Sequence, residues 1–104
     1  MRVINKDGTI DIPYEGTALE VKYNNYLPRT GNVYVPKSYW TINAYSSNYY
    51  SNHYNGYRIL GCYETREKAI DDLCNLRISC LKGEDFYILN GETNIEELGL
   101  KYSE

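Results

Sequence analysis

The sequence predicts an α+β fold, with an antiparallel sheet of about five strands, one long amphipathic helix on one face and a short C-terminal helix. Two observations support this. Segments in which apolar and polar residues alternate come first along the chain, and one long stretch with helical periodicity follows them. Strands grouped before a helix are typical of α+β folds, in which the helix packs on an antiparallel sheet. The length of 104 residues suits a single domain, 1–104.

The N-terminal part of the chain predicts a hairpin and a third strand. Residues 2–6 and 9–14 flank Asp7-Gly8, a pair that favours a two-residue turn because both positions adopt positive φ. Residues 18–23 alternate apolar with charged side chains and predict the third strand. Residues 24–32, NNYLPRTGN, combine Pro, Gly and Asn and predict a loop.

The middle of the chain predicts further strands around a polar segment. Residues 33–35 form a short candidate strand, and residues 39–45 form a longer one with clear alternation. Residues 46–56, SSNYYSNHYNG, are rich in Ser, Asn and Tyr and predict a surface loop that ends in the turn pair Asn55-Gly56. Residues 57–63 predict the strand that leads into the long helix.

Residues 65–83 predict the long helix. Thr65 is a good N-cap because its hydroxyl can accept a backbone N–H of the first turn, and Gly83 suits a left-handed C-terminal stop. Apolar residues at three-four spacing predict one buried face. They are Ala69, Ile70, Leu73, Cys74, Leu76, Cys80 and Leu81. The residues predicted for the opposite face are Lys68, Asp71, Asp72, Asn75, Ser79 and Lys82.

The C-terminal part predicts one strand and the short helix. Residues 86–89 form a compact apolar strand, and residues 93–96, TNIE, resemble a capping box. The helix that this box begins is expected to end near Gly99, and the last residues are expected to fray.

Arg77 interrupts the apolar pattern of the long helix. On a wheel of about 100° per residue it falls inside the apolar stripe, between Leu73 and Leu81. A buried charge without a partner is costly, so its guanidinium needs a partner or solvent. Two interpretations stay open: the stem packs while the head reaches solvent, or the guanidinium binds an anion or a partner surface.

Composition and motifs exclude several classes of protein. The net charge of −3 argues against a nonspecific DNA or RNA binder, and we expect no sequence-specific nucleic-acid partner either. There is no apolar run of transmembrane length and no signal peptide, so we expect no membrane association and a cytoplasmic location. Cys62, Cys74 and Cys80 lack metal-binding spacing and are expected to be reduced core residues.

The sequence offers no catalytic constellation. The single histidine, His53, lies in the polar 46–56 segment without an orienting partner. Asp71 and Asp72 are adjacent on the helix and would point about 100° apart, so they do not form a carboxylate pair. No nucleotide-binding or hydrolase motif is found. We therefore expect a non-enzymatic protein without a cofactor or a metal.

Tyrosine and arginine are the residue types that suggest binding. Tyr accounts for 13 of the 104 residues. A tyrosine face stacks on a nucleobase for about 1–3 kcal/mol, and an arginine fork binds phosphate oxygens. The candidate ligand- or partner-binding residues are Arg29, Tyr49, Tyr50, His53, Tyr54, Tyr57, Arg58 and Arg77. The same residue types also form protein interfaces or a solvated surface loop, and these alternatives stay open.

Two stretches resemble small proteins of phages and prophages of Gram-positive bacteria. The opening, MRVINKDGTIDIPYE, is similar to a first hairpin of the form RVI-x-x-DG-x-x-x-IPYE. The later stretch, LGCYETREKAIDDL, is similar to a G-x-Y-x-T-x-E-x-A junction between strand and helix. The residues that match this junction are Gly61, Tyr63, Thr65, Glu67 and Ala69.

This layout resembles the anti-Thoeris sponge family, whose members are oligomeric, non-enzymatic proteins that capture cyclic nucleotide immune signals. The resemblance implies a homo-oligomer that sequesters a cyclic nucleotide signal in the host bacterial cytoplasm. Phage proteins that block CRISPR nucleases share the hairpin. The resemblance therefore also implies an alternative, an anti-CRISPR-type protein that inhibits a host effector nuclease by direct protein–protein binding.

Overall fold

The computed structural model describes residues 1–26, 29–30, 33–34, 37–45 and 57–94, with only the backbone of residues 26, 29–30, 33–34 and 37. It confirms an α+β fold with antiparallel sheets and one long helix. The elements in chain order are β1 (Arg2–Ile4), β2 (Asp11–Pro13), β3 (Ala18–Tyr26), β4 (Arg29–Thr30), β5 (Val33–Tyr34), β6 (Lys37–Tyr45), β7 (Tyr57–Tyr63), α1 (Arg66–Leu81) and β8 (Phe86–Ile88).

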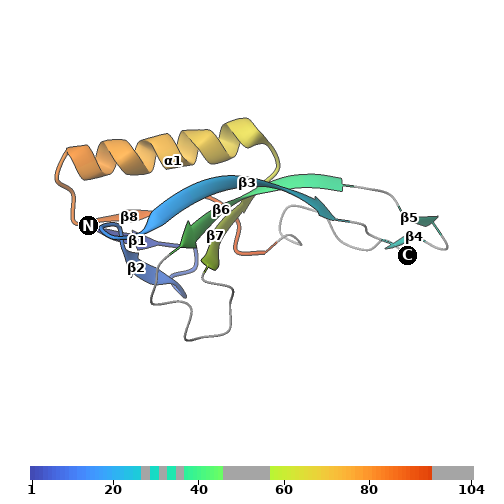
Figure 1. Cartoon of the computed structure of the whole chain (residues 1–104), viewed down its shortest axis with the longest axis horizontal. Coiled ribbons are helices and arrows are strands. Elements are labelled where there is room, and N and C mark those ends of the chain that lie inside the picture. Colours follow the sequence, from blue (N-terminus) through green and yellow to red (C-terminus); the bar gives the residue numbers. More distant parts are fainter. Residues whose placement is uncertain (27–28, 31–32, 35–36, 46–56, 95–104) are drawn as a thin grey trace.

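The described strands form two three-stranded sheets and a small hairpin, so the prediction of one sheet of about five strands is wrong. One sheet has the order β3-β6-β7 and is antiparallel throughout. The other has the order β2-β1-β8, in which β1 pairs antiparallel with β2 and parallel with β8. Helix α1 lies along one side of the strands, and the β4–β5 hairpin lies beyond the far ends of β3 and β6 (Figure 1).

The first hairpin is confirmed, but its turn is longer than the predicted two residues. The amide of Asn5 donates to the carbonyl of Ile10 at 3.0 Å and closes a wider loop. Inside it, Gly8 has a φ of 79°, and the carboxylate of Asp7 accepts from the amide and the hydroxyl of Thr9 at 3.0 and 2.6 Å. The side chain of Asp7 therefore competes with the tighter turn that Asp-Gly favours.

Backbone pairing extends the strands into segments with loop composition. In the segment predicted as the loop 24–32, β3 continues to Tyr26 and β4 takes Arg29–Thr30. Strand β3 pairs with β6 along its whole length, and this ladder outweighs the low strand propensity of its asparagines. The predicted loop 46–56 lies outside the described residues, and so does the predicted C-terminal helix from residue 95 onward; residues 93–94 are not helical.

Helix α1 begins and ends as predicted. The hydroxyl of Thr65 accepts the amide of Lys68 at 3.2 Å, which satisfies one free N–H of the first turn. At the other end Gly83 has a φ of 77°, and its amide donates to the carbonyl of Cys80 at 3.0 Å.

The buried face of α1 is rotated relative to the predicted one. Asp72 and Ser79 were predicted to face solvent but are buried with Ala69, Leu73 and Leu76. Cys74 and Leu81 were predicted to be buried but are exposed, Leu81 by 88%. The rotation has a physical cause, because Asp72 finds hydrogen-bond donors inside the protein.

All three cysteines are free, as expected, but only Cys62 is fully buried. Cys80 is half-buried and Cys74 lies on the solvent side of α1, so the prediction of three core cysteines is wrong for Cys74.

The core joins both sheets to the helix. It is one cluster of buried residues: Val3, Ile12, Ile42, Ala44, Leu60, Tyr63, Ala69, Leu73, Leu76 and Leu89. Ile42 and Ala44 of β6 point toward α1, so Thr41, Asn43 and Tyr45 belong to the opposite face of the sheet. Within the described chain, no helix has the length and apolar character needed to cross a membrane.

Candidate functional site

Among the described residues, the structure separates the predicted binding residues Arg29, Tyr57 and Arg77 rather than gathering them. Tyr49, Tyr50, His53 and Tyr54 lie outside the described residues. Arg29 belongs to β4, which Figure 1 shows at the opposite end of the protein from the C-terminal half of α1, where Arg77 lies.

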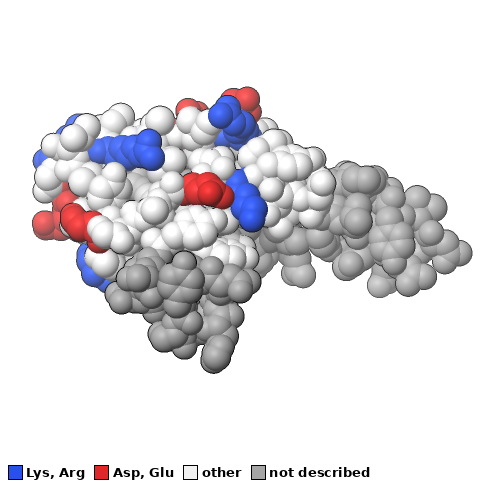
Figure 2. Space-filling model, viewed as in Figure 1, with Lys and Arg blue, Asp and Glu red and all other residues white. Residues whose placement is uncertain are grey.

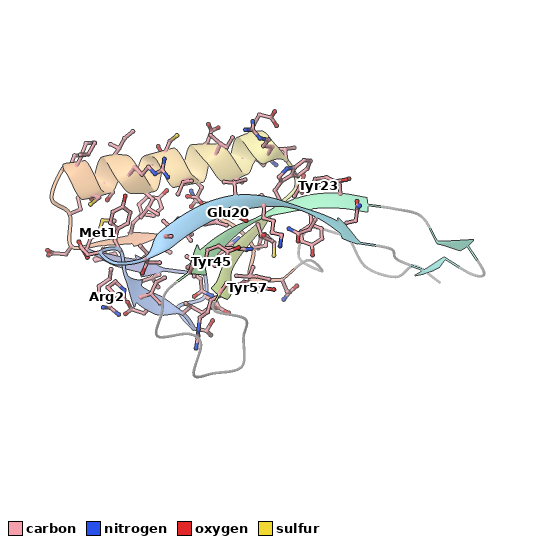
Figure 3. All side chains as sticks on the ribbon, in the orientation of Figure 1. Met1, Arg2, Glu20, Tyr23, Tyr45 and Tyr57 are labelled. Atoms are coloured by element: carbon pink, nitrogen blue, oxygen red, sulfur yellow. The ribbon has the colours of Figure 1, made fainter. Side chains whose placement is uncertain are left out.

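Tyr57 and Arg58 are neighbours in β7 and lie on opposite faces of its sheet. Tyr57 pairs with Tyr45 and Arg58 pairs with Ala44, and Ala44 belongs to the core beneath α1. The rings of Tyr45 and Tyr57 lie 5.8 Å apart between centroids, on the sheet face away from the helix (Figure 3). Tyr57 and Arg77 are therefore on opposite sides of this sheet and cannot bind the same small ligand.

Arg77 lines a groove between the C-terminal half of α1 and the connection from β2 to β3. The groove has a volume of about 540 Å³. Its lining residues are Tyr14, Glu15, Gly16, Thr17, Ala18, Leu19, Arg77 and Cys80. Arg77 is exposed, since the rotation of the buried face moves it to the edge of the core. In the described part of the chain its guanidinium has no ion-pair partner.

The wall of the groove opposite Arg77 is held by two hydrogen bonds to backbone carbonyls. The amide of Tyr14 donates to the carbonyl of Met1 at 2.9 Å, and the hydroxyl of Thr17 donates to the carbonyl of Pro13 at 2.7 Å. Gly16, with a φ of 79°, allows the chain to turn between them. These bonds hold the backbone at Tyr14, whose half-buried ring packs against the core beside the groove.

The electrostatics of the groove favour an anion. Glu15 also lines it, but its carboxylate accepts from the N-terminal ammonium at 2.9 and 3.2 Å. This hydrogen bond, with the charge of the ammonium, lowers the pKa of Glu15 below its usual value. Since the charge of Glu15 already has its counter-ion, the guanidinium of Arg77 is left to attract a negative group from solution.

The sequence analysis did not predict a buried cluster around Asp72. Its members are Tyr63, Asp72, Tyr87, Asn90 and Gly91, and we call it the Asp72 cluster. The carboxylate of Asp72 is 3% exposed and accepts from the hydroxyls of Tyr63 and Tyr87 at 2.5 and 2.6 Å. It also accepts from the amides of Asn90 and Gly91 at 2.7 and 3.3 Å. One signal was present: Asp72 lies three residues after Ala69 and four before Leu76, on the same helix face.

The Asp72 cluster has little hydrogen-bonding capacity left for a ligand. Burial, followed by the hydrogen bond and charge of Asp72, raises the pKa of Tyr63 and of Tyr87 above the ordinary tyrosine value. Both phenols therefore stay protonated as donors, and both oxygens of the carboxylate are occupied. Elsewhere in the described residues, no three His, Cys, Asp or Glu side chains are placed to hold a metal ion.

Comparison with protein-family models, with curated proteins and with solved structures finds no match to this chain. The arrangement of residues in the groove carries the functional argument. It combines one guanidinium that has no ion-pair partner among the described residues, one aromatic ring packed against the core and one hydroxyl.

Proposed function

We propose that this protein binds and sequesters a cyclic nucleotide signal in the groove of Arg77. In this proposal it is a phage-encoded, non-enzymatic inhibitor of host antiviral defence that acts as a homo-oligomer in the host bacterial cytoplasm. The observation that carries the proposal is the exposed guanidinium of Arg77, which lines a groove of about 540 Å³ without an ion-pair partner among the described residues.

The groove provides one group for each part of a nucleotide. The phosphodiester carries a negative charge, which the guanidinium of Arg77 binds through two parallel N–H donors. The ring of Tyr14 provides a face for the base. The hydroxyl of Thr17 donates to Pro13, so its oxygen remains an acceptor for a ribose hydroxyl. The volume lies within the about 300–1,000 Å³ common for small-molecule sites.

Binding without turnover is supported by the chemistry of the same lining. Hydrolysis of a phosphodiester requires an activated water or nucleophile and a group that moves its proton. In the described lining of the groove there is no histidine, and the carboxylate of Glu15 is held by the N-terminal ammonium. A bound nucleotide would therefore leave the groove unchanged, as sequestration requires.

The experiment is a thermal-shift screen of the purified protein against cyclic mono- and dinucleotides. A specific ligand at a hundredfold excess over its Kd should stabilise the protein by about 2.7 kcal/mol. Arg77→Ala should remove the shift and leave the fold intact, because Arg77 is exposed. The matched control is Arg66→Ala, at an exposed arginine of the same helix outside the groove. This variant should keep the thermal shift. A shift that survives in Arg77→Ala would contradict the proposal.

A second candidate function is direct inhibition of a host effector nuclease. It is favoured by two apolar side chains on the outer face of β8, Phe86 at 55% and Ile88 at 49% exposure. Beside them, across the sheet, lies the ion pair of Arg2 and Asp11 at 2.7 Å. Large apolar side chains with a charged rim are typical of protein interfaces.

Co-purification from host cells separates the two functions. If the nuclease is the target, Phe86→Ser with Ile88→Ser should lose the captured nuclease, while Arg77→Ala keeps it. If the nucleotide is the target, the same pair of changes should leave the thermal shift intact.

A further inference from the structure

Strand β8 forms an open edge of its three-stranded sheet. In the order β2-β1-β8, it pairs with β1 on one side, and no described strand lies on its other side. The amide of Leu89 donates to the carbonyl of Ile4 at 2.9 Å, so the odd-numbered residues of this stretch face β1. The backbone N–H and C=O groups of Phe86 and Ile88 therefore point away from β1. They have no hydrogen-bond partner among the described residues.

This edge lacks the protection that two other sheet edges carry. The opposite edge of the same sheet, β2, contains Asp11 and Pro13, and the edge strand β3 of the other sheet contains Glu20 and Lys22. Charged side chains and proline discourage the addition of a further strand. The sequence of β8, FYI, has neither, and its two outward side chains are apolar and exposed. An edge of this kind is a template for another strand.

A polar pocket of about 310 Å³ lies where β8 ends. Residues 90–92, which follow the strand, line it, and so do Lys68, Asp71 and Asn75 of α1. At about 3.3 Å per residue, the first of residues 90–92 lies about 7 Å beyond the end of β8, so a chain paired with β8 brings its next side chains to the pocket. The volume is at the lower end of the range of about 300–1,000 Å³ for small-molecule sites and suits one long side chain.

The pocket is acidic. Glu64 and Glu92 also line it, and each is paired with a lysine, at 3.5 and 2.8 Å. Asp71 is exposed and has no ion pair in the described part of the chain. The carboxylate of Asp72 accepts from neutral donors, so its charge has no cation beside it there. The pocket therefore attracts a basic side chain, and Asp71 is its ion-pair partner because the oxygens of Asp72 are occupied.

The other end of β8 is acidic as well. Glu84 and Asp85 precede the strand, are exposed and form no ion pair with any described residue. Lys82, shortly before them in the chain, partly offsets their charge, and Arg2 on the neighbouring strand is paired with Asp11 at 2.7 Å. Figure 2 shows acidic side chains at the left end of the protein, where the chain passes from α1 to β8 in Figure 1. The edge is thus apolar in its middle and acidic at both ends.

We propose that the β8 edge binds an extended basic segment of a partner protein, which adds a fourth strand to the sheet. Apolar side chains of this segment contact Phe86 and Ile88, and basic residues lie on either side of them. One basic side chain enters the pocket and pairs with Asp71, and another meets the acids before β8. Main-chain hydrogen bonds to the free edge supply affinity, and the charges select the partner.

This site is separate from the groove of Arg77, since the pocket and the groove share no lining residue. It depends neither on a nucleotide in the groove nor on a nuclease as the partner. Arg77→Ala, which should remove nucleotide capture, is therefore expected to leave the binding of a basic segment unchanged. The two proposals can fail independently of each other.

Selection from a yeast-displayed library of random dodecapeptides tests the proposal on the purified protein. We expect the enriched peptides to alternate apolar residues and to carry Lys or Arg beside them. Each enriched peptide is then synthesised, and its Kd is measured by fluorescence anisotropy. Enrichment of acidic peptides, or no enrichment over the starting library, would overturn the proposal.

Backbone methylation shows whether the peptide pairs as a strand. Only every second N–H of an added strand bonds to β8, so N-methyl groups at alternate positions should weaken binding about tenfold and those between them less than about twofold. Ile88→Pro removes an outward N–H of the edge and should also weaken binding, whereas Ile88→Val keeps that N–H and should keep the Kd. Methylation effects without this alternation would contradict the addition of a strand.

A matched pair of charge reversals tests the pocket. Asp71→Lys should weaken peptide binding by about fivefold, because like charges then meet in the pocket. Glu67→Lys, at an exposed acid of the same helix outside the pocket, changes the net charge equally and should weaken binding by less than about twofold. Replacing the basic residue of the peptide by glutamate should restore its binding to Asp71→Lys. An enriched peptide that binds Asp71→Lys as tightly as the wild type would refute the role of the pocket.

Discussion

Asp72 and Arg77 lie five positions apart on the same helix and have opposite surroundings. Asp72 is buried, and its carboxylate accepts hydrogen bonds from two phenols and two backbone amides. Arg77 is exposed in a groove, without an ion-pair partner in the described residues. A charged group whose hydrogen-bonding capacity is fully used stabilises the fold, whereas a charged group with unused capacity is available to a ligand.

The Asp72 cluster joins parts of the chain that are distant in sequence. A buried carboxylate without a cation is costly unless hydrogen bonds replace its hydration. Its donors come from Tyr63 at the end of β7, from Tyr87 in β8 and from the segment after β8. The carboxylate therefore fixes where β8 and the residues after it lie against α1.

The largest expected effect is the loss of this carboxylate. Asp72→Ala leaves two phenols and two amides without their acceptor, at about 1–3 kcal/mol for each group that stays buried and unsatisfied. We expect a loss of about 3 kcal/mol or more in the free energy of unfolding, measured by urea denaturation. Asp71→Ala, at the exposed neighbour, should stay within about 0.5 kcal/mol of the wild type. Equal effects at the two positions would show that the cluster does not stabilise the fold.

A smaller loss of stability is expected from Gly91→Ala, because the ring of Tyr63 packs against the backbone of Gly91. A Cβ atom added at Gly91 would lie 2.4 Å from Cζ and 2.6 Å from the hydroxyl of Tyr63. Gly91→Ala should therefore push the phenol away from Asp72 and cost about 1–3 kcal/mol, the range for overpacking. Asn90→Ala keeps the backbone amide that Asp72 accepts, so it should cost less in the same urea denaturation. If Gly91→Ala is as stable as the wild type, the ring of Tyr63 has room to move.

Alkaline pH should weaken the Asp72 cluster. The folded-state pKa of Tyr63 is raised above its unfolded value near 10, so the stability it contributes is present below about pH 10 and is lost as pH rises further. Each such phenol lowers the free energy of unfolding by about 1.4 kcal/mol per pH unit in that range. Tyr63→Phe should make the decline between pH 10 and 11.5 shallower by about that amount, as followed by urea denaturation. An unchanged slope would contradict the link between Tyr63 and Asp72.

The smallest effect on stability is expected at Arg77. Its exposed guanidinium has no ion pair to lose in the described chain, so Arg77→Ala should change the free energy of unfolding by no more than about 0.5 kcal/mol. The measurement is the same urea denaturation, made without ligand. A loss of stability as large as that of Asp72→Ala would show that Arg77 stabilises the fold, and the two residues would then not differ in role.

Local signals in the sequence predicted the ends of the helix and the first hairpin. Thr65 and Gly83 act through hydrogen bonds to residues at most a few positions away, so their effect is readable without the fold. The pairing of β8 with β1 is different, because the chain between them is long and the choice of neighbour depends on the packed core. This is why one sheet was predicted where two exist.

The sequence predicted the role of Arg77 better than that of Asp72, because the signal for Arg77 is local and the partners of Asp72 are distant in the chain. Arg77 stood out because it breaks an apolar pattern within its own helix. The opposite wall of its groove, from Tyr14 to Leu19, is supplied by a distant segment and could not be foreseen. Asp72 was assigned to solvent as a polar residue, because its donors at Tyr63, Tyr87 and Asn90 are assembled only by the fold.

Chemical-shift mapping by two-dimensional NMR can locate the bound nucleotide on the protein. We expect the cyclic nucleotide selected by the thermal-shift screen to perturb the amides of residues 14–19 and 77–80, the walls of the groove, and to leave the amide of Asp72 unchanged. We also expect these perturbations to vanish in Arg77→Ala. Perturbations centred on the Tyr45–Tyr57 face, with the groove unaffected, would contradict binding in the groove.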